Sequence, residues 1–191
     1  MTVAHRSAPR QTAGMDAAIV PDDKDWTWVL DSVCAECGFD SASFAVTEVG
    51  GMIRENAAAF AVVLAGDAAL LRARPDPATW SALEYGAHVR DVYRLFRERL
   101  ALMLDEDDPL FANWDQDATA VEERYAEQDP GDVSAELVVA AELLADAFDA
   151  VAGEQWHRQG RRSDGSVFTV DTFARYLIHD PVHHLHDVTA S

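Results

Sequence analysis

Four of the seven histidines in the chain fall within residues 179–186. On an α-helix, residues four apart lie about 40° apart around the axis, and residues seven apart lie about 20° apart. A helix over this segment would therefore present His179, His183 and His186 on one face. Because neutral imidazole is the commonest protein ligand for zinc and similar divalent metals, the spacing predicts a metal site. The alternative is a solvated, histidine-rich helix end.

Ligands from one helix cannot complete such a site, and His88 is the candidate for the ligand that comes from elsewhere. It shares an apolar helical stripe with Tyr85 and Val92, so it should point inward. A lone inward-facing histidine is otherwise most often a satisfied core residue. The predicted metal ligands are His88, His179 and His183. Three protein ligands with an open fourth position are the arrangement of catalytic zinc, and water, a thiolate or a carbonyl substrate could bind there.

Three aspartates, Asp91, Asp180 and Asp187, each lie within four residues of a predicted ligand. Any of them could accept a hydrogen bond from the outer nitrogen of a ligating imidazole and so fix its tautomer. The alternative for each is a solvated carboxylate.

Pro181 lies inside the predicted ligand helix, where it removes one backbone hydrogen bond and favours a kink. A kink would turn His183 enough to make His184 the ligand in its place. His186 is a further alternative, as a fourth ligand that closes the site. We retain His183 because its spacing places it nearest to the face of His179.

Cys34 and Cys37 form a single C-x-x-C pair. Three interpretations compete: half of a mixed Cys/His metal site, a redox-active dithiol, or two ordinary reduced thiols. A zinc ribbon would need a second pair of cysteines, which the sequence does not contain. No thioredoxin-like βαβ pattern surrounds the pair, which favours the third interpretation.

Four stretches with helical periodicity must position these residues, and they cover roughly 43–65, 79–104, 132–151 and 169–188. Candidate N-caps are Thr79, Asp132 and Thr169. Strand signals are weak, and the stretch 167–170 is too short to build a sheet. Four amphipathic helices of this length predict an all-α four-helix bundle, a fold that builds metal sites from facing helices. The apolar sides of the four helices contain Ile53, Ala57, Phe60, Leu64, Leu83, Tyr85, His88, Val92, Leu95, Phe96, Leu102, Val133, Leu137, Leu144, Phe148, Val151, Phe173, Tyr176 and Leu177.

The predicted organisation has three parts: a disordered tail over 1–24, an irregular lead-in over 25–41 that carries the C-x-x-C pair, and the bundle over 42–188. Trp26 and Trp28 could anchor the lead-in on the bundle. The connection 105–131, between the second and third helices, is long for a bundle. Connections of this length are usually functional covers or mobile segments, and a solvated crossover connection is the alternative.

Two aromatic residues of this connection, Trp114 and Tyr125, could close the mouth of a substrate site. Arg90, Arg175 or the Arg161-Arg162 pair could neutralise a substrate carboxylate. Packing against the bundle and solvated surface charge are the alternatives. The sequence assigns no catalytic residue beyond the metal ligands.

The net charge of −19 and the pI near 4.5 argue against electrostatic binding to nucleic acids or anionic membranes. No apolar run is long enough to span a membrane. The basic residues near Met1 are not followed by an apolar segment, so no secretory signal is expected. A cytoplasmic location is the default expectation.

Residues 80–92, followed about 90 residues later by 176–184, resemble the DinB-like superfamily. The similarity covers roughly 42–188, and the branch it favours lies near the N-terminal domain of mycothiol-dependent maleylpyruvate isomerases. The resemblance implies a four-helix bundle that holds a divalent metal, often zinc or nickel. One histidine on the second helix and two ligands on the last would bind it, and these correspond to His88, His179 and His183.

The resemblance also implies a function, because characterised members use low-molecular-weight thiols such as mycothiol in isomerase or S-transferase reactions. The partners would then be a small-molecule substrate and the thiol. The sequence departs from the isomerase pattern in three ways. The isomerase has a further C-terminal domain, one of its helix ligands is a Glu where His179 stands here, and Pro181 interrupts the ligand helix.

The leading hypothesis is therefore a metal-dependent thiol S-transferase or isomerase. The second is a non-catalytic metal-binding module with a structural or sensing role. The third is a metal-free interaction protein that forms a homodimer through an exposed helix face.

Overall fold

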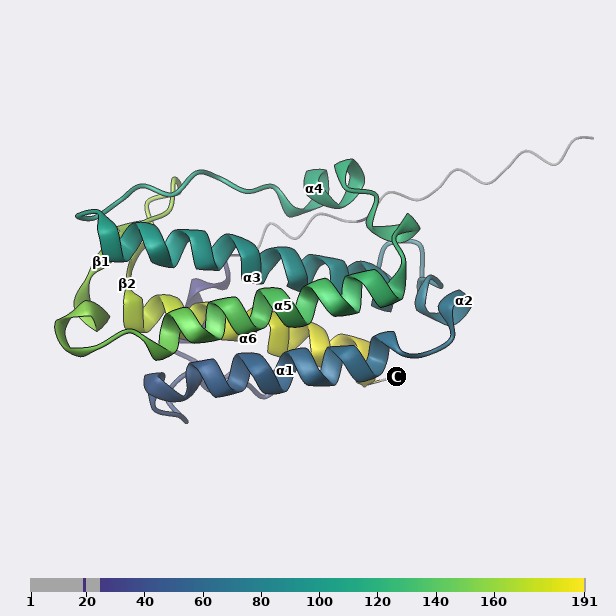
Figure 1. Ribbon diagram of the computed structural model, residues 1–191, viewed down its shortest axis with the longest axis horizontal. Helices are drawn as coiled ribbons and strands as arrows, with labels where there is room; N and C mark the ends of the chain where they lie inside the picture. Colours follow the sequence, from purple (N-terminus) through teal and green to yellow (C-terminus); the bar gives the residue numbers. More distant parts are fainter. Residues whose placement is uncertain (1–18, 20–24, 191) are drawn as a thin grey trace, which may run out of the picture.

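Four long helices lie side by side and form a bundle (Figure 1). They are α1 (Val49–Leu64), α3 (Ala82–Asp105), α5 (Pro130–Asp149) and α6 (Val170–Thr189). The predicted all-α four-helix bundle is therefore confirmed. No helix in the described part of the chain is both long and apolar enough to cross a membrane.

The computed structural model describes Ile19 and residues 25–190. The disordered tail predicted over 1–24 falls, apart from Ile19, outside the described residues. The lead-in that follows is only partly irregular, because it contains the short 3-10 helix η1 (Trp26–Leu30), which packs against α6. A second 3-10 helix, η2 (Val46–Glu48), leads directly into α1.

The helices are not arranged in chain order. Helix α5 packs against α1 and α3, and α6 packs against the same two helices. The order around the bundle is therefore α1, α5, α3, α6. Because α6 contacts α3, the histidine-rich segment of α6 can meet His88 on α3. The short helix α2 (Ala68–Leu71) lies in the connection between α1 and α3.

The predicted apolar stripes form the core between these helices. The stripes of α1 and α5 are buried throughout, namely Ile53, Ala57, Phe60, Leu64, Val133, Leu137, Leu144 and Phe148. Leu102 of α3 is an exception, because it is 36% exposed. The stripe of α3 runs instead through Tyr93, Phe96, Leu100 and Met103, which recur at helical spacing and are buried. Leu102 is rotated by about 100° from Met103 and so lies outside this stripe.

Helix α3 begins after Ser81, two residues later than predicted. The Ser81 hydroxyl accepts a hydrogen bond from the backbone of Glu84, and the Glu84 carboxylate accepts one from the Ser81 backbone. This reciprocal capping box satisfies two of the backbone donors at the helix start. Thr79, the predicted cap, donates to Asp76 instead.

The other two cap predictions had different outcomes. Asp129 caps α5, because its carboxylate accepts hydrogen bonds from the backbone N–H groups of Gly131 and Asp132. Pro130 occupies the first helical position, where its missing N–H costs nothing. Asp132, the predicted cap, lies inside that helix. Thr169 caps α6, as predicted.

The long connection after α3 is partly ordered by helices. It contains α4 (Gln116–Glu122) and the 3-10 helix η3 (Tyr125–Glu127), both of which contact α3. In Figure 1 the connection runs along the outer side of α3. Phe111 and Tyr125 are buried against the bundle, so the connection is packed along part of its length.

A small hairpin precedes α6. After η4 (Gly153–His157), strand β1 (Gln159–Arg161) pairs antiparallel with β2 (Val167–Thr169), with Gly160 opposite Phe168. The expectation that 167–170 could not build a sheet was wrong, because β1 supplies a local partner strand. Since Thr169 ends β2 and caps α6, the hairpin fixes where the ligand helix starts.

Helix α6 continues through Pro181 without interruption. The Asn56 side chain donates a hydrogen bond of 2.8 Å to the Pro181 carbonyl. The Tyr93 hydroxyl donates one of 2.8 Å to Oδ1 of Asn56. These buried contacts join α1, α3 and α6 next to the histidine-rich segment.

Candidate metal centre

The candidate ligands on α6 form two pairs with the same four-residue spacing, His179 with His183 and Asp180 with His184. Consecutive helical residues are rotated by about 100°, so the two pairs lie on different faces of α6. One pair meets α3, and the other meets the lead-in. The described residues therefore contain two groups of facing ligand atoms, and within each group these atoms lie within 4.8 Å of one another.

The first group consists of His88 on α3 with Asp180 and His184 on α6. Nε2 of His88 lies 3.5 Å from the Asp180 carboxylate. Nε2 of His184 lies 3.7 Å from Oδ2 of the same carboxylate. The centroids of the His88 and His184 rings are 5.0 Å apart, with an angle of 80° between the ring planes. One carboxylate thus lies beside two imidazoles from different helices.

His88 is completely buried and packed between aromatic rings. Trp114 stacks on it with a centroid separation of 5.5 Å and an interplanar angle of 14°. Trp80 packs at 5.1 Å from another direction. Nδ1 of His88 has no hydrogen-bond partner among the described residues. Aromatic packing therefore does most to fix the position of this imidazole.

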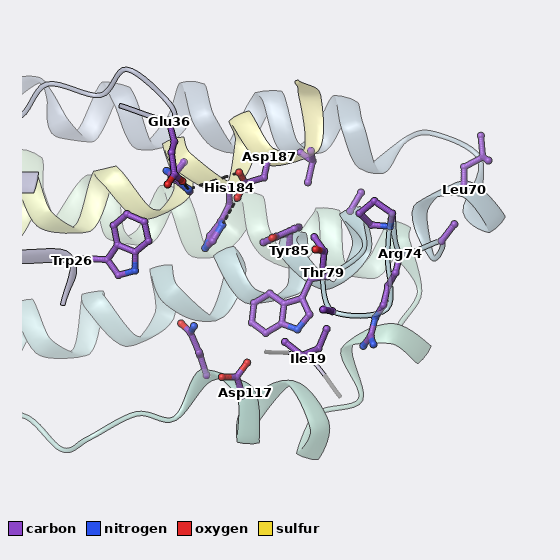
Figure 2. Close-up of a pocket in the computed structure, with 18 residues that line it drawn as sticks. Ile19, Trp26, Glu36, Leu70, Arg74, Thr79, Tyr85, Asp117, His184 and Asp187 are labelled. Atoms are coloured by element: carbon purple, nitrogen blue, oxygen red, sulfur yellow. Dashed lines mark hydrogen bonds and ion pairs between the residues drawn. The ribbon is translucent and has the colours of Figure 1, made fainter. Parts of the chain in front are cut away.

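Asp187 supports the other imidazole of the group. Its Oδ2 lies 3.2 Å from Nδ1 of His184, on the same helix (Figure 2). When the Nδ1–H group of His184 donates a hydrogen bond to this carboxylate, Nε2 carries the lone pair that can bind a metal. Asp187 was one of the aspartates predicted for such a role.

Asp180 carries the negative charge of the group. Burial by itself would raise the pKa of Asp180, but the neighbouring His184 and His88 lower it to about 2. Its Oδ1 is buried and has no hydrogen-bond partner in the described part of the chain. Burying a carboxylate oxygen without a hydrogen bond costs free energy, and a cation would reduce that cost. Two imidazoles and a carboxylate are also a ligand set that zinc accepts, so the group fits a divalent metal.

The second group contains Cys34 and Cys37 of the lead-in with His179 and His183 of α6. Cys34, His179 and His183 are buried, and Cys37 is partly buried. Burial, followed by the nearby His183, lowers the pKa of His179 to about 4. The imidazole of His179 is therefore neutral at physiological pH.

The predicted set of His88, His179 and His183 is thus divided between the two groups. His88 faces Asp180 and His184, while His179 and His183 face the two cysteines. Of the predicted alternative ligands, His184 belongs to the first group. His186 is exposed and belongs to neither group.

Asp91 does not act on an imidazole. Its carboxylate accepts a hydrogen bond of 2.7 Å from the Tyr125 hydroxyl and two of 2.9 Å from Arg90. Tyr125 is completely buried, so it packs in the core and does not reach the mouth of a substrate site. The alternative reading, packing against the bundle, describes Tyr125 in the structure.

The predicted substrate arginines Arg90 and Arg175 have structural partners. Arg90 is 5% exposed and bound to Asp91 and Glu136. Arg175 binds Asp171 and the backbone carbonyls of Ser41 and Phe44, which precede α1. Neither arginine lines the cavity beside the first group.

A cavity of about 370 Å³ opens beside the first group. Trp114 lines this cavity, whereas Tyr125, the other aromatic residue considered for closing a substrate site, does not. Arg162 also lines it, and its guanidinium donates a hydrogen bond of 3.0 Å to the Tyr176 hydroxyl. The guanidinium of Arg99 is the second positive charge in the wall. Burial and the nearby Arg162 lower the pKa of Arg99 to about 10, so Arg99 stays charged at neutral pH.

Arg99 is a cavity residue that sequence reasoning missed. It follows His88 by eleven residues, which on a helix is a rotation of only about 20°. The two side chains therefore leave α3 on nearly the same face, and this spacing was the available signal.

A second cavity, of about 640 Å³, lies on the other side of His184. Figure 2 shows His184 between Trp26 and Tyr85, with Asp117 on the opposite wall. The residues that line both cavities are Trp26, Gln116, Asp117, His183 and His184. His184 therefore borders two cavities, and the first group can be approached from both.

Comparisons with known proteins agree with this architecture. The family model of the DinB superfamily matches residues 52–188. No curated protein matched the chain in a sequence comparison. Among solved structures, the chain is similar to YfiT from Bacillus subtilis, "a probable metal-dependent hydrolase with an unusual four-helix bundle topology". The TM-score is 0.69 at 18% sequence identity, over 78% of this chain and 88% of YfiT. Since the family model matches well over half of the chain, the chain belongs to the DinB superfamily.

Proposed function

We propose that the protein is a divalent-metal-dependent enzyme that uses a low-molecular-weight thiol of the mycothiol type in S-transfer or isomerisation of a small anionic substrate. The metal, zinc or nickel, would be held by His88, Asp180 and His184. The observation that carries the proposal is that Asp180 and His184 border a cavity whose wall also contains Arg99 and Arg162, while the third ligand, His88, is completely buried beside them.

The ligand set supports a catalytic site. Three protein ligands are typical of catalytic zinc, whereas structural sites use four. A divalent metal supplies Lewis acidity, which lowers the pKa of a thiol or water molecule bound to it. Asp187 holds the tautomer of His184, and Trp114 shields His88 from solvent by stacking on it.

The carboxylate in the ligand set supports thiol chemistry. In the isomerase branch one helix ligand is a Glu, and the resemblance places His179 at that position. In the structure the residue that faces His88 and His184 is Asp180, one position later. A histidine, a carboxylate and a histidine therefore recur in the order found in that branch. Water is the competing nucleophile, as in the hydrolase activity ascribed to YfiT.

The charges of the cavity support an anionic substrate. Arg99 and Arg162 contribute two positive charges, and Asp115, Asp117 and Asp180 contribute three negative ones. A divalent ion at the first group adds two positive charges, so the net charge of the cavity wall changes from negative to positive. A guanidinium binds a carboxylate through paired hydrogen bonds, so either arginine could orient the substrate.

The test is turnover by tag-free protein loaded with zinc or nickel. The loaded protein is incubated with mycothiol and maleylpyruvate, and with mycothiol and 1-chloro-2,4-dinitrobenzene, to follow isomerisation and S-transfer. We expect thiol-dependent turnover that His184→Ala abolishes and that His186→Ala, on the exposed side of the same helix, retains. If the protein hydrolyses p-nitrophenyl acetate without thiol and shows no thiol-dependent turnover, the nucleophile is water and not a thiol. Metal binding without any turnover would favour the alternative, a non-catalytic metal-binding module.

A further inference from the structure

The C-x-x-C pair is folded so that both sulfur atoms face α6. The backbone N–H of Gly38 donates a hydrogen bond of 2.8 Å to the Cys34 carbonyl, and the Cys34 N–H donates one of 2.8 Å to the Phe39 carbonyl. Gly38 has a φ of +77°, a conformation that glycine adopts without strain. This closed turn brings Cys34 and Cys37 together against the His179 face of α6.

The distances between these side chains suit a tetrahedral ion. Sγ of Cys34 lies 3.6 Å from Nδ1 of His183. A tetrahedral zinc ion with its usual bond lengths to sulfur and nitrogen would separate such a pair by about 3.6 Å. The ligand atoms of Cys34, Cys37, His179 and His183 all lie within 4.8 Å of one another. The spacing C-x2-C with H-x3-H is also the spacing typical of structural zinc sites.

A buried nitrogen without a partner points independently to a ligand. His179 is only 3% exposed, and its Nε2 has no hydrogen-bond partner in the part of the chain that the structure describes. Phe39 and Trp26 pack on the imidazole, each with a centroid separation of 5.3 Å. An imidazole nitrogen held in apolar surroundings in this way lacks the interaction that a metal would provide.

The other histidine of the group is oriented as metal-binding histidines usually are. While Nδ1 of His183 faces Cys34, its Nε2 lies 3.2 Å from the Glu36 carboxylate. Figure 2 shows Glu36 at the upper edge of the cavity, above His184. A carboxylate that accepts a hydrogen bond from the outer N–H of a ligating imidazole fixes the tautomer of that imidazole. Glu36 lies between the two cysteines in the sequence, so one turn supplies two ligands and this support.

We propose that Cys34, Cys37, His179 and His183 form a second metal site, a structural zinc site that attaches the lead-in to α6. Its four protein ligands leave no open position, in contrast to the three ligands of the first group. The site makes the lead-in a fixed wall of both cavities, because Trp26, which lines them, packs on the two histidines. This proposal does not depend on the proposed function, since each metal group has ligands of its own.

A redox-active dithiol is the competing interpretation of the C-x-x-C pair. A dithiol that exchanges with a partner needs an accessible sulfur, whereas Cys34 is 1% exposed and Cys37 is partly buried against α6. That interpretation also leaves the two buried histidines without a role.

Cobalt(II) provides a probe that separates the two sites. The tag-free full chain is stripped of metal under reducing conditions and titrated with cobalt(II), which gives strong thiolate-to-metal charge-transfer absorption only when sulfur is bound. We expect two ions per chain and this absorption in the unsubstituted protein. Cys37→Ser should lose the absorption and one ion, whereas His88→Ala should lose the other ion and keep the absorption. His186→Ala, on the same helix, should keep both.

The unsubstituted protein decides the question even if Cys37→Ser does not fold. Zinc should slow the reaction of both thiols with a disulfide reagent at least tenfold, and should displace the cobalt absorption. A single bound ion with thiolate absorption would support this site and contradict the first one. Cobalt bound without thiolate absorption, or thiols that react equally fast with and without zinc, would overturn the proposal.

Discussion

Asn56 on α1 donates a hydrogen bond of 2.8 Å to the carbonyl oxygen of Pro181 on α6. Asn56 in turn accepts a hydrogen bond from Tyr93 on α3. Pro181 lies between the two members of each ligand pair of α6, one residue after Asp180 and three before His184. The contact therefore fixes the part of α6 that places the ligands of the first group relative to α3.

Replacing Asn56 should destabilise the fold. Asn56→Ala removes the hydrogen-bond partner of the Tyr93 hydroxyl and the side-chain donor to the Pro181 carbonyl, and it opens a small cavity. We therefore expect the free energy of unfolding to fall by about 2–4 kcal/mol. Tyr93→Phe, which removes only one hydroxyl, should cost about 1 kcal/mol. Urea unfolding of metal-free protein measures both. Equal stabilities of Asn56→Ala and the unsubstituted protein would show that this contact contributes little.

Asp187 should act on metal affinity and leave the ligand set unchanged. Asp187→Asn weakens the acceptor at Nδ1 of His184, and the loss of such an outer partner typically costs about 10–100-fold in metal affinity. Competition with a chromophoric chelator measures the dissociation constant. Asp132→Asn, an exposed position on α5, removes the same charge and should leave the affinity unchanged. If the two variants have the same metal dissociation constant, Asp187 has no specific effect on His184.

The arginines of the cavity should affect substrate affinity more than metal content. Arg162→Gln removes a charged hydrogen-bond donor, so we expect KM for an anionic substrate to rise about tenfold with one metal still bound at the first group. Arg97→Gln, at an exposed position of α3, is the matched control. A fall in kcat with unchanged KM would instead place Arg162 at the reacting atoms.

Stability should depend on pH through Asp91. Burial would raise the pKa of Asp91, but the hydrogen bonds from Arg90 and Tyr125 and the charges of Arg90 and Arg94 outweigh burial, so the pKa lies below its ordinary 3.8. Because the folded-state pKa is the lower one, the ionised carboxylate stabilises the fold fully above about pH 5, and this contribution is lost as the pH falls through the folded-state value.

Asp91→Asn should therefore be less stable than the unsubstituted protein at pH 7, by about 2 kcal/mol, and the difference should shrink on acidification below pH 4 or so. Urea unfolding at pH 7 and pH 3 measures this. The same difference at both pH values would show that the charge of Asp91 has no part in it. For Asp132→Asn, the difference in free energy of unfolding from the unsubstituted protein should not change between pH 7 and pH 3.

Helical periodicity was sufficient to predict the fold because the apolar stripes of α1 and α5 are long and regular. The caps were harder to predict. Thr79 and Ser81 both precede the apolar run, and only the return contact from Glu84 selects Ser81. Leu102 has an apolar side chain like a core residue, but it lies outside the buried stripe through Tyr93 and Met103 and is therefore partly exposed.

The histidine spacing led to α3 and α6, whose facing ligand atoms form the first group, but it could not separate the two candidate ligand pairs of α6. His179 with His183 and Asp180 with His184 have the same spacing, and periodicity does not indicate which pair faces His88. The deciding factor is where the lead-in packs, because Cys34 occupies the face of His179 and leaves the face of Asp180 to α3. Such a contact, across about 145 residues of chain, has no signal in local sequence patterns.

The order of the helices around the bundle has a consequence for how the chain folds. Only α3 and α5 are both consecutive long helices and close neighbours, whereas α6 must find α1 across more than 100 residues. Bundles with local contacts fold in microseconds to milliseconds, and folding slows as the mean sequence separation of the contacts rises. The assembly of both ligand groups has to wait for that distant pairing, so metal uptake during refolding should report the final docking of α6 and not the earlier formation of its helix.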